Sequence, residues 1–403
     1  MLINALKVGA LFNYKLKKGL AGRRQSCELV QEHFKPSDKV IWMHAASLGE
    51  YEQGLPVLER LKAQFPNHKV LITFFSPSGY ENVIRKSHPA DVVCYLPFDT
   101  EKFVKEFVSS FSPEIFIIVK YDFWYNLIAE VKAKGAKVYV ISALFYETQV
   151  FFKAYGKWFV KQLQQNVDWF FHQTKHSTAL AKSIKLLSSS TAGDTRFDRV
   201  KRQLEQDNHV NFIADFVKED KTVVFGSSWE SEERLAEIIC SKNSKVKIII
   251  APHDLKRVVH LQELFPNALL YSQLEKGVSF QNSNSRVLII DCIGLLSRLY
   301  SYASVAVVGG GFHTKGLHNI LEAAVFGVPV LFGDQYRKNP EADNLITSHG
   351  AKSFEDEFFA APFLLNLLHN DDRRKSMGEN ASKFIQQQPN ATEIIVAKIL
   401  SDK

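Results

Sequence analysis

A chain of 403 residues exceeds what one ordinary hydrophobic core holds and suits two domains. Its composition, 46% hydrophobic and 23% charged, is that of a globular protein and excludes a disordered or fibrous chain. Four well-separated cysteines, Cys27, Cys94, Cys240 and Cys292, form no Cys-x-x-Cys pair, so neither disulfides nor a zinc site are predicted. No apolar run reaches the roughly 18 residues of a transmembrane helix, and the interrupted N-terminal run is a poor signal peptide.

Positive charge is concentrated at the N-terminus. The formal net charge is +7, and residues 1–25 carry six cations and no acid, so the rest of the chain is close to neutral. A nucleic-acid-binding protein would spread its cations over a folded face, so nucleic acid is not an expected partner. Apolar residues beside the lysines are typical of a helix that lies on an anionic membrane surface; the alternative is a helix that packs on the next domain. The cations are Lys7, Lys15, Lys17, Lys18, Arg23 and Arg24, and the apolar residues are Leu2, Ile3, Leu6, Leu11 and Phe12.

Short apolar runs alternate with amphipathic stretches along the first half of the chain. The runs are rich in β-branched and aromatic residues, and the first two are followed by the turns Ser-Leu-Gly-Glu and Ser-Pro-Ser-Gly. This rhythm predicts a parallel sheet covered by helices on both faces. The expected strands are 40–44, 70–74, 92–96, 115–119 and 138–141.

The rhythm restarts after a polar stretch, 199–221, that indicates a helix and a linker. The second set of expected strands is 222–225, 246–250, 287–290, 305–308 and 328–332, with helical patterns from 354 to 400. The sequence therefore predicts an α/β fold of two Rossmann-like, doubly wound parallel-sheet domains facing a cleft, with ligands at the carboxyl ends of the strands. The expected divisions are a basic membrane-associating segment (1–25), an N-terminal domain (26–205), a C-terminal domain (206–385) and a C-terminal helix (386–403).

The clearest candidate ligand site follows the expected strand 305–308. Three glycines, 309–311, let the backbone pass close to a ligand, and Asn319 is expected at a helix start, where free N–H groups favour a phosphate. Glu322 lies one turn further, where a carboxylate suits ribose hydroxyls. Asn-x-x-Glu is also the signature of a capping box, and the two roles are compatible. With the ordered run 327–330, this pattern predicts a nucleotide-linked donor.

A second candidate stands in the turn after the expected strand 40–44. Ser47 caps the next helix and Glu50 is its third residue, so a capping box is one interpretation. The other is that Glu50 accepts the proton of an attacking hydroxyl. A carboxylate near a helix N-terminus is expected to stay ionised at neutral pH, as a base must. The residues alone leave both interpretations open.

Two turns of the second domain carry further polar residues at strand ends. Gly226 and Ser227 belong to a strand-to-helix turn able to take phosphate oxygens. Pro252 shapes a loop against a planar base, and His253 is able to donate to a phosphate or a base.

Arg196 stands at the end of the first domain. Its guanidinium is suited to neutralise a leaving phosphate or a sugar carboxylate. The alternative is a surface salt bridge with Asp194 or Asp198, which contributes little.

Taken in order, these motifs resemble the 3-deoxy-D-manno-oct-2-ulosonic acid (Kdo) transferases, which attach Kdo to lipid A precursors. The resemblance covers nearly the whole chain. It implies a GT-B fold, CMP-Kdo as donor, a lipid A precursor of the lipid IVA type as acceptor, inversion at the anomeric carbon and no required metal or cofactor. It also implies a peripheral enzyme of lipopolysaccharide biosynthesis on the cytoplasmic face of the bacterial inner membrane. The motifs that carry it are 47–50, 123–126, 193–198, 226–229, 309–322 and 327–329.

Carried over position by position, the resemblance makes Glu50 the catalytic base. Asp122 and Arg196 stand where the family has glutamate and lysine, and both would stabilise the transition state. Pro252-His253 replaces a Pro-Arg pair at the CMP. The remaining implied donor contacts are Ile293, Gly294 and Leu295 (in place of Met-Gly-Glu), Gly310, Gly311 and Lys315 of the glycine loop, and Asn319, Ile320, Leu321 and Glu322.

Three departures from the family pattern indicate a divergent branch. Leu295 supplies no carboxylate, Tyr125 replaces a proline, and Asp122 reaches one methylene less far than glutamate. The alternatives are a nucleotide-sugar epimerase, another GT-B glycosyltransferase with a different donor, and a non-catalytic binding protein. An epimerase would need no membrane-seeking start, and a non-catalytic protein would not need the charges at Glu50, Asp122 and Arg196.

Overall fold

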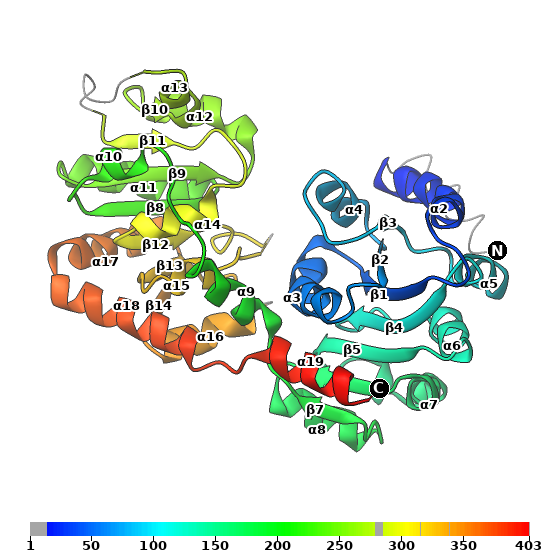
Figure 1. Cartoon of the computed structure of the whole chain (residues 1–403). Coiled ribbons are helices and arrows are strands. Elements are labelled where there is room, and N and C mark those ends of the chain that lie inside the picture. The colour runs from blue at the N-terminus through cyan, green and yellow to red at the C-terminus, as the bar shows by residue number, and fades with distance from the viewer. Residues whose placement is uncertain (1–13, 279–284, 315, 338, 403) are drawn as a thin grey trace. The chain divides into compact units, whose positions relative to one another are not determined.

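The computed structural model describes residues 14–278, 285–314, 316–337 and 339–402 (Figure 1). It divides into two compact units: unit 1 runs to Arg199 and resumes at Pro389, and unit 2 is Val200–Gln388. The division expected from sequence at residue 205 falls slightly beyond the observed one. The C-terminal helix, which the sequence assigned to neither domain, is part of unit 1.

Unit 1 is built on a seven-stranded parallel sheet in the order β3-β2-β1-β4-β5-β6-β7. The five expected strands are confirmed, and two short ones at one edge, β6 and β7, extend the sheet beyond them. The strands are β1 (Lys39–Ala45), β2 (Lys69–Phe74), β3 (Val92–Tyr95), β4 (Ser112–Val119), β5 (Lys137–Ala143), β6 (Trp169–His172) and β7 (Ser189–Thr191).

Helices cover both faces of this sheet, as Figure 1 shows. One face buries an aromatic cluster around Trp42, whose indole N–H donates to Thr73 Oγ1 at 2.9 Å, so that its one polar group is satisfied. The other face buries α3 and the C-terminal helix α19 (Ala391–Ser401). The remaining helices are α2 (Tyr14–His33), α3 (Leu48–Gln64), α4 (Pro77–Val83), α5 (Glu101–Val108), α6 (Tyr125–Ala133), η1 (Val150–Phe152), η2 (Ala154–Gly156), α7 (Lys157–Asn166), α8 (Lys175–Ser183) and α9 (Thr195–Gln203).

Helix α2 crosses the expected boundary at residue 25. From Gly22 onward it packs on its own domain: Arg23 donates to the Phe75 carbonyl oxygen at 2.7 Å and lies 4.5 Å above the Phe75 ring, and Val30 is fully buried. Arg23 is therefore engaged by the protein and is not a free membrane cation. Residues 1–13 of the proposed membrane-associating segment lie outside the described residues. Among the helices that are described, none is long and apolar enough to cross a membrane.

Unit 2 repeats the architecture with the strand order β10-β11-β9-β8-β12-β13-β14, again all parallel. The expected strands are confirmed, and the two edge strands β10 and β14 are additional. The strands are β8 (Thr222–Ser228), β9 (Lys247–Pro252), β10 (Leu269–Leu270), β11 (Val287–Ile289), β12 (Val305–Val308), β13 (Val330–Gly333) and β14 (Ala351–Phe354).

The helices of unit 2 cover its sheet on both sides (Figure 1). Those packed around the core that contains Leu235, Ile239 and Leu364 include α11 and α17. The helices are α10 (Ile213–Val217), α11 (Glu230–Lys242), η3 (Leu255–Arg257), α12 (Val258–Leu264), α13 (Tyr271–Glu275), α14 (Leu296–Leu299), η5 (Tyr300–Tyr302), α15 (Leu321–Ala324), α16 (Pro340–Thr347), α17 (Glu357–His369) and α18 (Asp371–Gln386). In both units the polar turns singled out in the sequence follow the carboxyl ends of central strands.

Candidate functional site

Glu50 lies in the first turn of α3, directly after strand β1. Ser47 is the N-cap, and its hydroxyl accepts the Glu50 N–H, while the Glu50 carboxylate accepts the N–H of Ala46 at 2.5 Å. The capping interpretation is therefore confirmed in a shifted form, because the carboxylate returns to Ala46 and not to Ser47. This bond fixes the carboxylate at the carboxyl edge of the sheet, half-buried.

The turn after β4 brings Asp122 to the same edge. The Asp122 carboxylate accepts from His44 Nε2 at 2.9 Å, and the His44 ring, fully buried, contacts Thr73 through Nδ1 at 3.0 Å. Lys120 precedes Asp122 with a positive φ of 66°, a strained conformation for a non-glycine residue that bends the chain at the end of the strand. His44 was not singled out in the sequence, although its position at the end of the buried strand β1 marked it.

The electrostatics of Glu50 differ from the sequence expectation. Burial raises the pKa of Glu50, and this outweighs the lowering by Lys120 and by the Ala46 N–H; Asp122 raises it further and His44 lowers it. The helix N-terminus is thus not the dominant influence. A raised pKa makes the carboxylate a stronger proton acceptor than an exposed glutamate.

Arg196 is held by Asp194, as the salt-bridge alternative proposed. The guanidinium donates to the Asp194 carboxylate through Nε at 2.9 Å and through Nη2 at 2.7 Å. Asp194 is nearly buried and also accepts from Gln53 on α3 at 3.1 Å. Since Gln53 lies one turn after Glu50, Gln53 and Asp194 connect the Arg196 turn to the helix that carries Glu50.

Strand β8 of unit 2 contains a bulge at its carboxyl end. The pairing with β9 shifts register between Gly226 and Ser228, and Ser227 between them has a φ of 52°. Bulges of this kind terminate pairing and redirect side chains beside functional sites. The backbone of Gly226 accepts the Gly309 N–H at 2.8 Å, so the two predicted turns lie side by side.

The glycine loop after β12 is required first by the protein's own backbone. A Cβ at Gly311 would overlap the backbone of Gly333, and Gly310 has a φ of 91°, which favours glycine. The Gly310 N–H donates to Glu232 at 3.1 Å, and the second oxygen of this fully buried carboxylate accepts the Trp229 N–H at 2.9 Å. Glu232 therefore ties the β8 turn to the glycine loop, a residue that the spacing Trp229-x-x-Glu232 marked only as a possible helix cap.

Three imidazole rings and an indole gather at this edge. The Trp229 ring is stacked on His253 with centroids 4.5 Å apart and meets His313 edge-on at 4.8 Å, and His253 lies 4.7 Å from His318. Burial lowers the pKa of His318 to about 4, with further lowering by His253 and His313. The structure thus places the predicted residue His253 among aromatic partners that the sequence analysis did not select. Their common position at strand ends was the available signal.

The Asn-x-x-Glu stretch differs from its expected form. Asn319 is not the N-cap: α15 is a four-residue helix beginning at Leu321, capped by the Ile320 position without a side-chain bond. The Asn319 side chain accepts the Leu321 N–H and donates to Glu322, each at 3.1 Å. Ile320 and Leu321 are fully buried, so they offer a ligand only backbone groups.

The remaining predicted donor residues lie near the same turns or outside the description. Leu296, directly after Leu295, reaches the position of Gly226, whereas Ile293 is 80% exposed and Gly294 has a φ of 98°. Lys315 lies outside the described residues. Pro252 ends β9, and the His253 N–H donates to the Ser228 carbonyl oxygen at 3.0 Å, which fixes this loop against the β8 turn.

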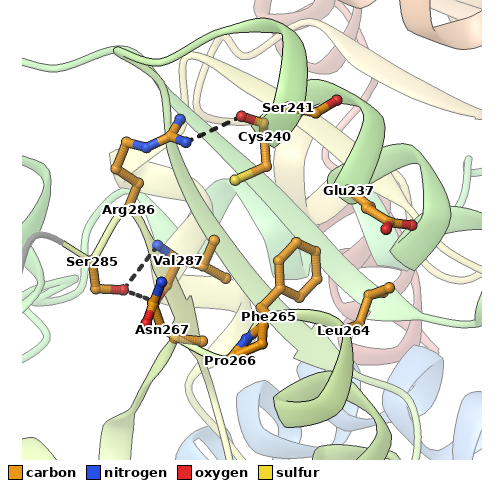
Figure 2. Close-up of a pocket in the computed structure, with 11 residues that line it drawn as sticks. Glu237, Cys240, Ser241, Leu264, Phe265, Pro266, Asn267, Ser285, Arg286 and Val287 are labelled. Atoms are coloured by element: carbon orange, nitrogen blue, oxygen red, sulfur yellow. Dashed lines mark hydrogen bonds between the residues drawn. The ribbon is translucent and has the colours of Figure 1, made fainter.

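A hollow of about 350 Å³ on unit 2 does not coincide with these residues (Figure 2). It is lined by Val287 at the start of β11 and by Asn267 before β10, which places it at the amino edge of the sheet. Its cation, Arg286, already donates to the carbonyl oxygens of Asn243 and Cys240. Among the described residues, no group of three or more His, Cys, Asp or Glu side chains is arranged to hold a metal ion. All four cysteines are free thiols.

The sequence is similar to known proteins along most of its length. Residues 21–199 match the family model described as 3-deoxy-D-manno-octulosonic-acid transferase (kdotransferase). The chain is 28% identical over 386 residues to a "3-deoxy-D-manno-octulosonic acid transferase" of Chlamydia trachomatis serovar D, covering 90% of this chain and 86% of that protein. It is 26% identical over 330 residues to a protein of the same name from Aquifex aeolicus strain VF5, covering 80% and 83%.

The fold has a counterpart among solved structures. UDP-GlcNAc 2-epimerase from Neisseria meningitidis, bound to UDP-GlcNAc, aligns with 90% of this chain and 100% of its own at a TM-score of 0.61 and 17% identity. At this identity the likeness concerns the fold alone, and it confirms the expected two-domain α/β fold of the GT-B kind. The chain is thus a glycosyltransferase homologue whose N-terminal domain belongs to the 3-deoxy-D-manno-octulosonic-acid (Kdo) transferase family.

Proposed function

We propose that this protein transfers Kdo from CMP-Kdo to a lipid A precursor of the lipid IVA type, with inversion at the anomeric carbon. The proposal is supported by relatives named 3-deoxy-D-manno-octulosonic acid transferases, which align with most of the chain. The observation that carries it is the environment of Glu50 in the domain that matches the family model. There a half-buried carboxylate of raised pKa lies within the electrostatic influence of Lys120 and Asp122.

In the proposed reaction Glu50 is the general base. An acceptor hydroxyl oxygen attacks the anomeric carbon of Kdo while the Glu50 carboxylate takes the hydroxyl proton. The bond from the anomeric carbon to the phosphate oxygen breaks, and its electron pair leaves with CMP. Attack on the face opposite the leaving group inverts the configuration.

Asp122 and Arg196 take supporting parts in this proposal. His44 holds the Asp122 carboxylate at 2.9 Å, so its negative charge has a fixed place at the edge where positive charge develops on the sugar ring. Arg196, oriented by Asp194, presents a guanidinium for the leaving phosphate or the Kdo carboxylate.

The donor is assigned to the carboxyl edge of the unit 2 sheet. The rings of Trp229, His253 and His318 offer surfaces for a planar base and N–H groups for a phosphate. The Glu322 carboxylate, held by Asn319, is an acceptor for ribose hydroxyls.

We also place the protein on the cytoplasmic face of the inner membrane as a peripheral protein. The lipid nature of the acceptor and the cationic start of the sequence support this location. An epimerase would share the fold, but the fold likeness favours neither function, whereas the named relatives favour transfer.

The direct test is incubation of the purified full chain with CMP-Kdo and a tetraacyl disaccharide phosphate, followed by mass spectrometry of the lipid. The expected product is the acceptor with Kdo added and an equivalent of CMP. UDP-GlcNAc, examined by NMR in parallel, is expected to stay unchanged. Folded protein that binds CMP but yields no Kdo-lipid would defeat the proposal, and epimerised UDP-GlcNAc would replace it.

A further inference from the structure

A hollow of about 540 Å³ lies on the surface of unit 1 against helix α7. Its floor is apolar, formed by Phe151, Phe152, Val160 and Ile184. The segment between β5 and α7 and the end of α8 close its sides, and Gln164 on α7 donates to the carbonyl oxygen of Ile184 at 3.2 Å. The hollow is therefore built by two helices that are bonded to each other.

Four lysines surround this apolar floor. They are Lys153, Lys157, Lys161 and Lys185. Lys157 and Lys161 are one turn apart on α7 and so share one face of the helix. All four are exposed, and no carboxylate in the described part of the chain lies within ion-pair distance of their ammonium groups. The neighbouring acids are engaged elsewhere: Asp168 pairs with Lys132, and Glu147 with His176.

Exposed aromatic side chains continue the surface beside the hollow. Tyr155 is 78% exposed and Trp158 is 57% exposed, in a stretch from 148 to 166 that contains three lysines and no acid. Tyrosine and tryptophan at this exposure are typical of the boundary between water and lipid, where the ring sits among headgroups. We call Lys153, Lys157, Lys161, Lys185, Tyr155 and Trp158 the α7 surface (α7 in Figure 1).

We propose that the α7 surface docks on a bilayer containing anionic phospholipid, with the lysines at lipid phosphates and the apolar floor receiving part of a lipid chain. The charge argument selects this partner, because four unpaired ammonium groups complement a sheet of phosphates. The apolar floor and exposed rings distinguish it from a purely electrostatic polyanion site, which needs no greasy base.

The location fits the proposed function, on which the benefit of docking rests. The Trp158 ring lies 4.8 Å from the Tyr125 ring, and Tyr125 begins α6 three residues after Asp122. The α7 surface therefore adjoins the sheet edge at which Asp122 and Glu50 stand. Docking there brings a membrane-embedded acceptor to the edge with the proposed base.

The test uses the full chain and vesicles of phosphatidylcholine, with or without phosphatidylglycerol. Flotation should require phosphatidylglycerol, and the combined variant Lys153→Glu, Lys157→Glu, Lys161→Glu should partition about tenfold or more weaker than the parent. The matched control is Lys86→Glu, Lys102→Glu, Lys134→Glu, which makes the same charge change at exposed lysines elsewhere on unit 1 and should bind nearly as the parent does. Equal loss in both triple variants would show that only net charge matters and would overturn the proposal.

A second measurement reports on insertion even if another segment also binds the membrane. Brominated acyl chains should quench part of the tryptophan fluorescence, and Trp158→Phe should remove that part. Quenching that survives in Trp158→Phe, or none in the parent on anionic vesicles, would overturn the proposal. Transfer to acceptor in detergent micelles separates the two hypotheses, because the charge-reversed variant should keep full activity there. A parent that is inactive in micelles but docks on vesicles would count against the proposed function alone.

Discussion

Glu50 combines two tasks in one carboxylate. Its bond to the Ala46 N–H holds the start of α3, and burial raises its pKa so that it takes a proton readily. Helix capping leaves one oxygen of the carboxylate for a second partner, because a carboxylate offers several acceptor positions. The capping and catalytic interpretations are therefore compatible at this residue.

Glu50→Gln should lower Kdo transfer by about a hundredfold or more, because an amide cannot take the hydroxyl proton. The amide oxygen can still accept the Ala46 N–H, so folding should be retained, and CMP affinity should stay unchanged. The measurement is the initial rate by mass spectrometry together with CMP titration by calorimetry. Glu52→Gln is the control, since Glu52 forms a partly exposed pair with Arg199 and should matter little. A Glu50→Gln rate above about a tenth of the parent, a barrier change under about 1.4 kcal/mol, would assign the base to another group.

The histidines of unit 2 make a prediction about pH. The pKa of His318 is lowered to about 4, so it is neutral at pH 7 without a ligand. A bound phosphate favours the protonated ring, which raises that pKa and couples binding to proton uptake. CMP should therefore bind more tightly as the pH falls from 7.5 to 6, with protons taken up. Calorimetry in two buffers of different ionisation enthalpy measures the uptake.

The variant His253→Arg offers the matched comparison, because arginine carries its charge at all these pH values. It should bind CMP with less dependence on pH than the parent. Equal pH slopes in the two proteins, or no proton uptake by the parent, would contradict a role for the histidines in holding the phosphate.

At the scale of elements, the glycine loop after β12 is a strand-to-strand connection fixed by Glu232. Gly310→Ala should destabilise unit 2 by about 2 kcal/mol or more, because alanine is disfavoured at a φ of 91° and its Cβ would overlap the Gly316 carbonyl oxygen. CMP affinity should fall about tenfold or more, about 1.4 kcal/mol. Urea unfolding and CMP titration measure the two effects.

Gly277→Ala separates backbone strain from the clash. Gly277 has a φ of 89°, close to that of Gly310, but a Cβ there meets no atom within 4 Å. It should cost only about 1 kcal/mol from its conformation and leave CMP binding unchanged. An equal effect of both substitutions on CMP affinity would show that the glycine loop does not shape the donor site.

The elements that were hardest to foresee are the edge strands. β1 and β4 are long runs of buried β-branched and aromatic residues, which the sequence displays directly. β7 is Ser189–Thr191 and β10 is the pair Leu269–Leu270, and both gain strand geometry only from pairing with a neighbour. The same dependence on context reduced the expected helix after Asn319 to the four residues of α15.

For the whole molecule, the C-terminal helix α19 is an integral part of unit 1. Ile395 and Ile399 are fully or almost fully buried in the core that α19 shares with α3, and the Asp198 carboxylate accepts the Thr392 N–H at 2.6 Å. The chain therefore completes its first domain only with its last residues.

Ile395→Ala should destabilise unit 1 by about 2–5 kcal/mol, because it leaves a cavity in a fully buried site. Ile394→Ala is the control, since the neighbouring Ile394 is 42% exposed and its loss should stay within about 0.5 kcal/mol. Thermal unfolding followed with and without CMP assigns the transitions, because a ligand of unit 2 raises only the transition of unit 2. A lowered unit 2 transition in Ile395→Ala, with unit 1 unchanged, would contradict the placement of α19.

The sequence by itself determined the two α/β domains, their central strands and the turns that carry Glu50, Asp122, Arg196 and the glycine loop. These features are local, because hydrophobic period, glycine and capping residues act within a few positions of the chain. The resemblance to Kdo transferases likewise rests on motifs in order along the chain.

Only the tertiary structure decided which distant groups meet. It paired His44 with Asp122 and Arg196 with Asp194, and it grouped Trp229 with three histidines. It also placed α19 in the first domain and gathered the four lysines around an apolar floor. These outcomes depend on contacts between residues far apart in the chain, and the free energy of such contacts comes from burial and pairing that no short window of sequence contains.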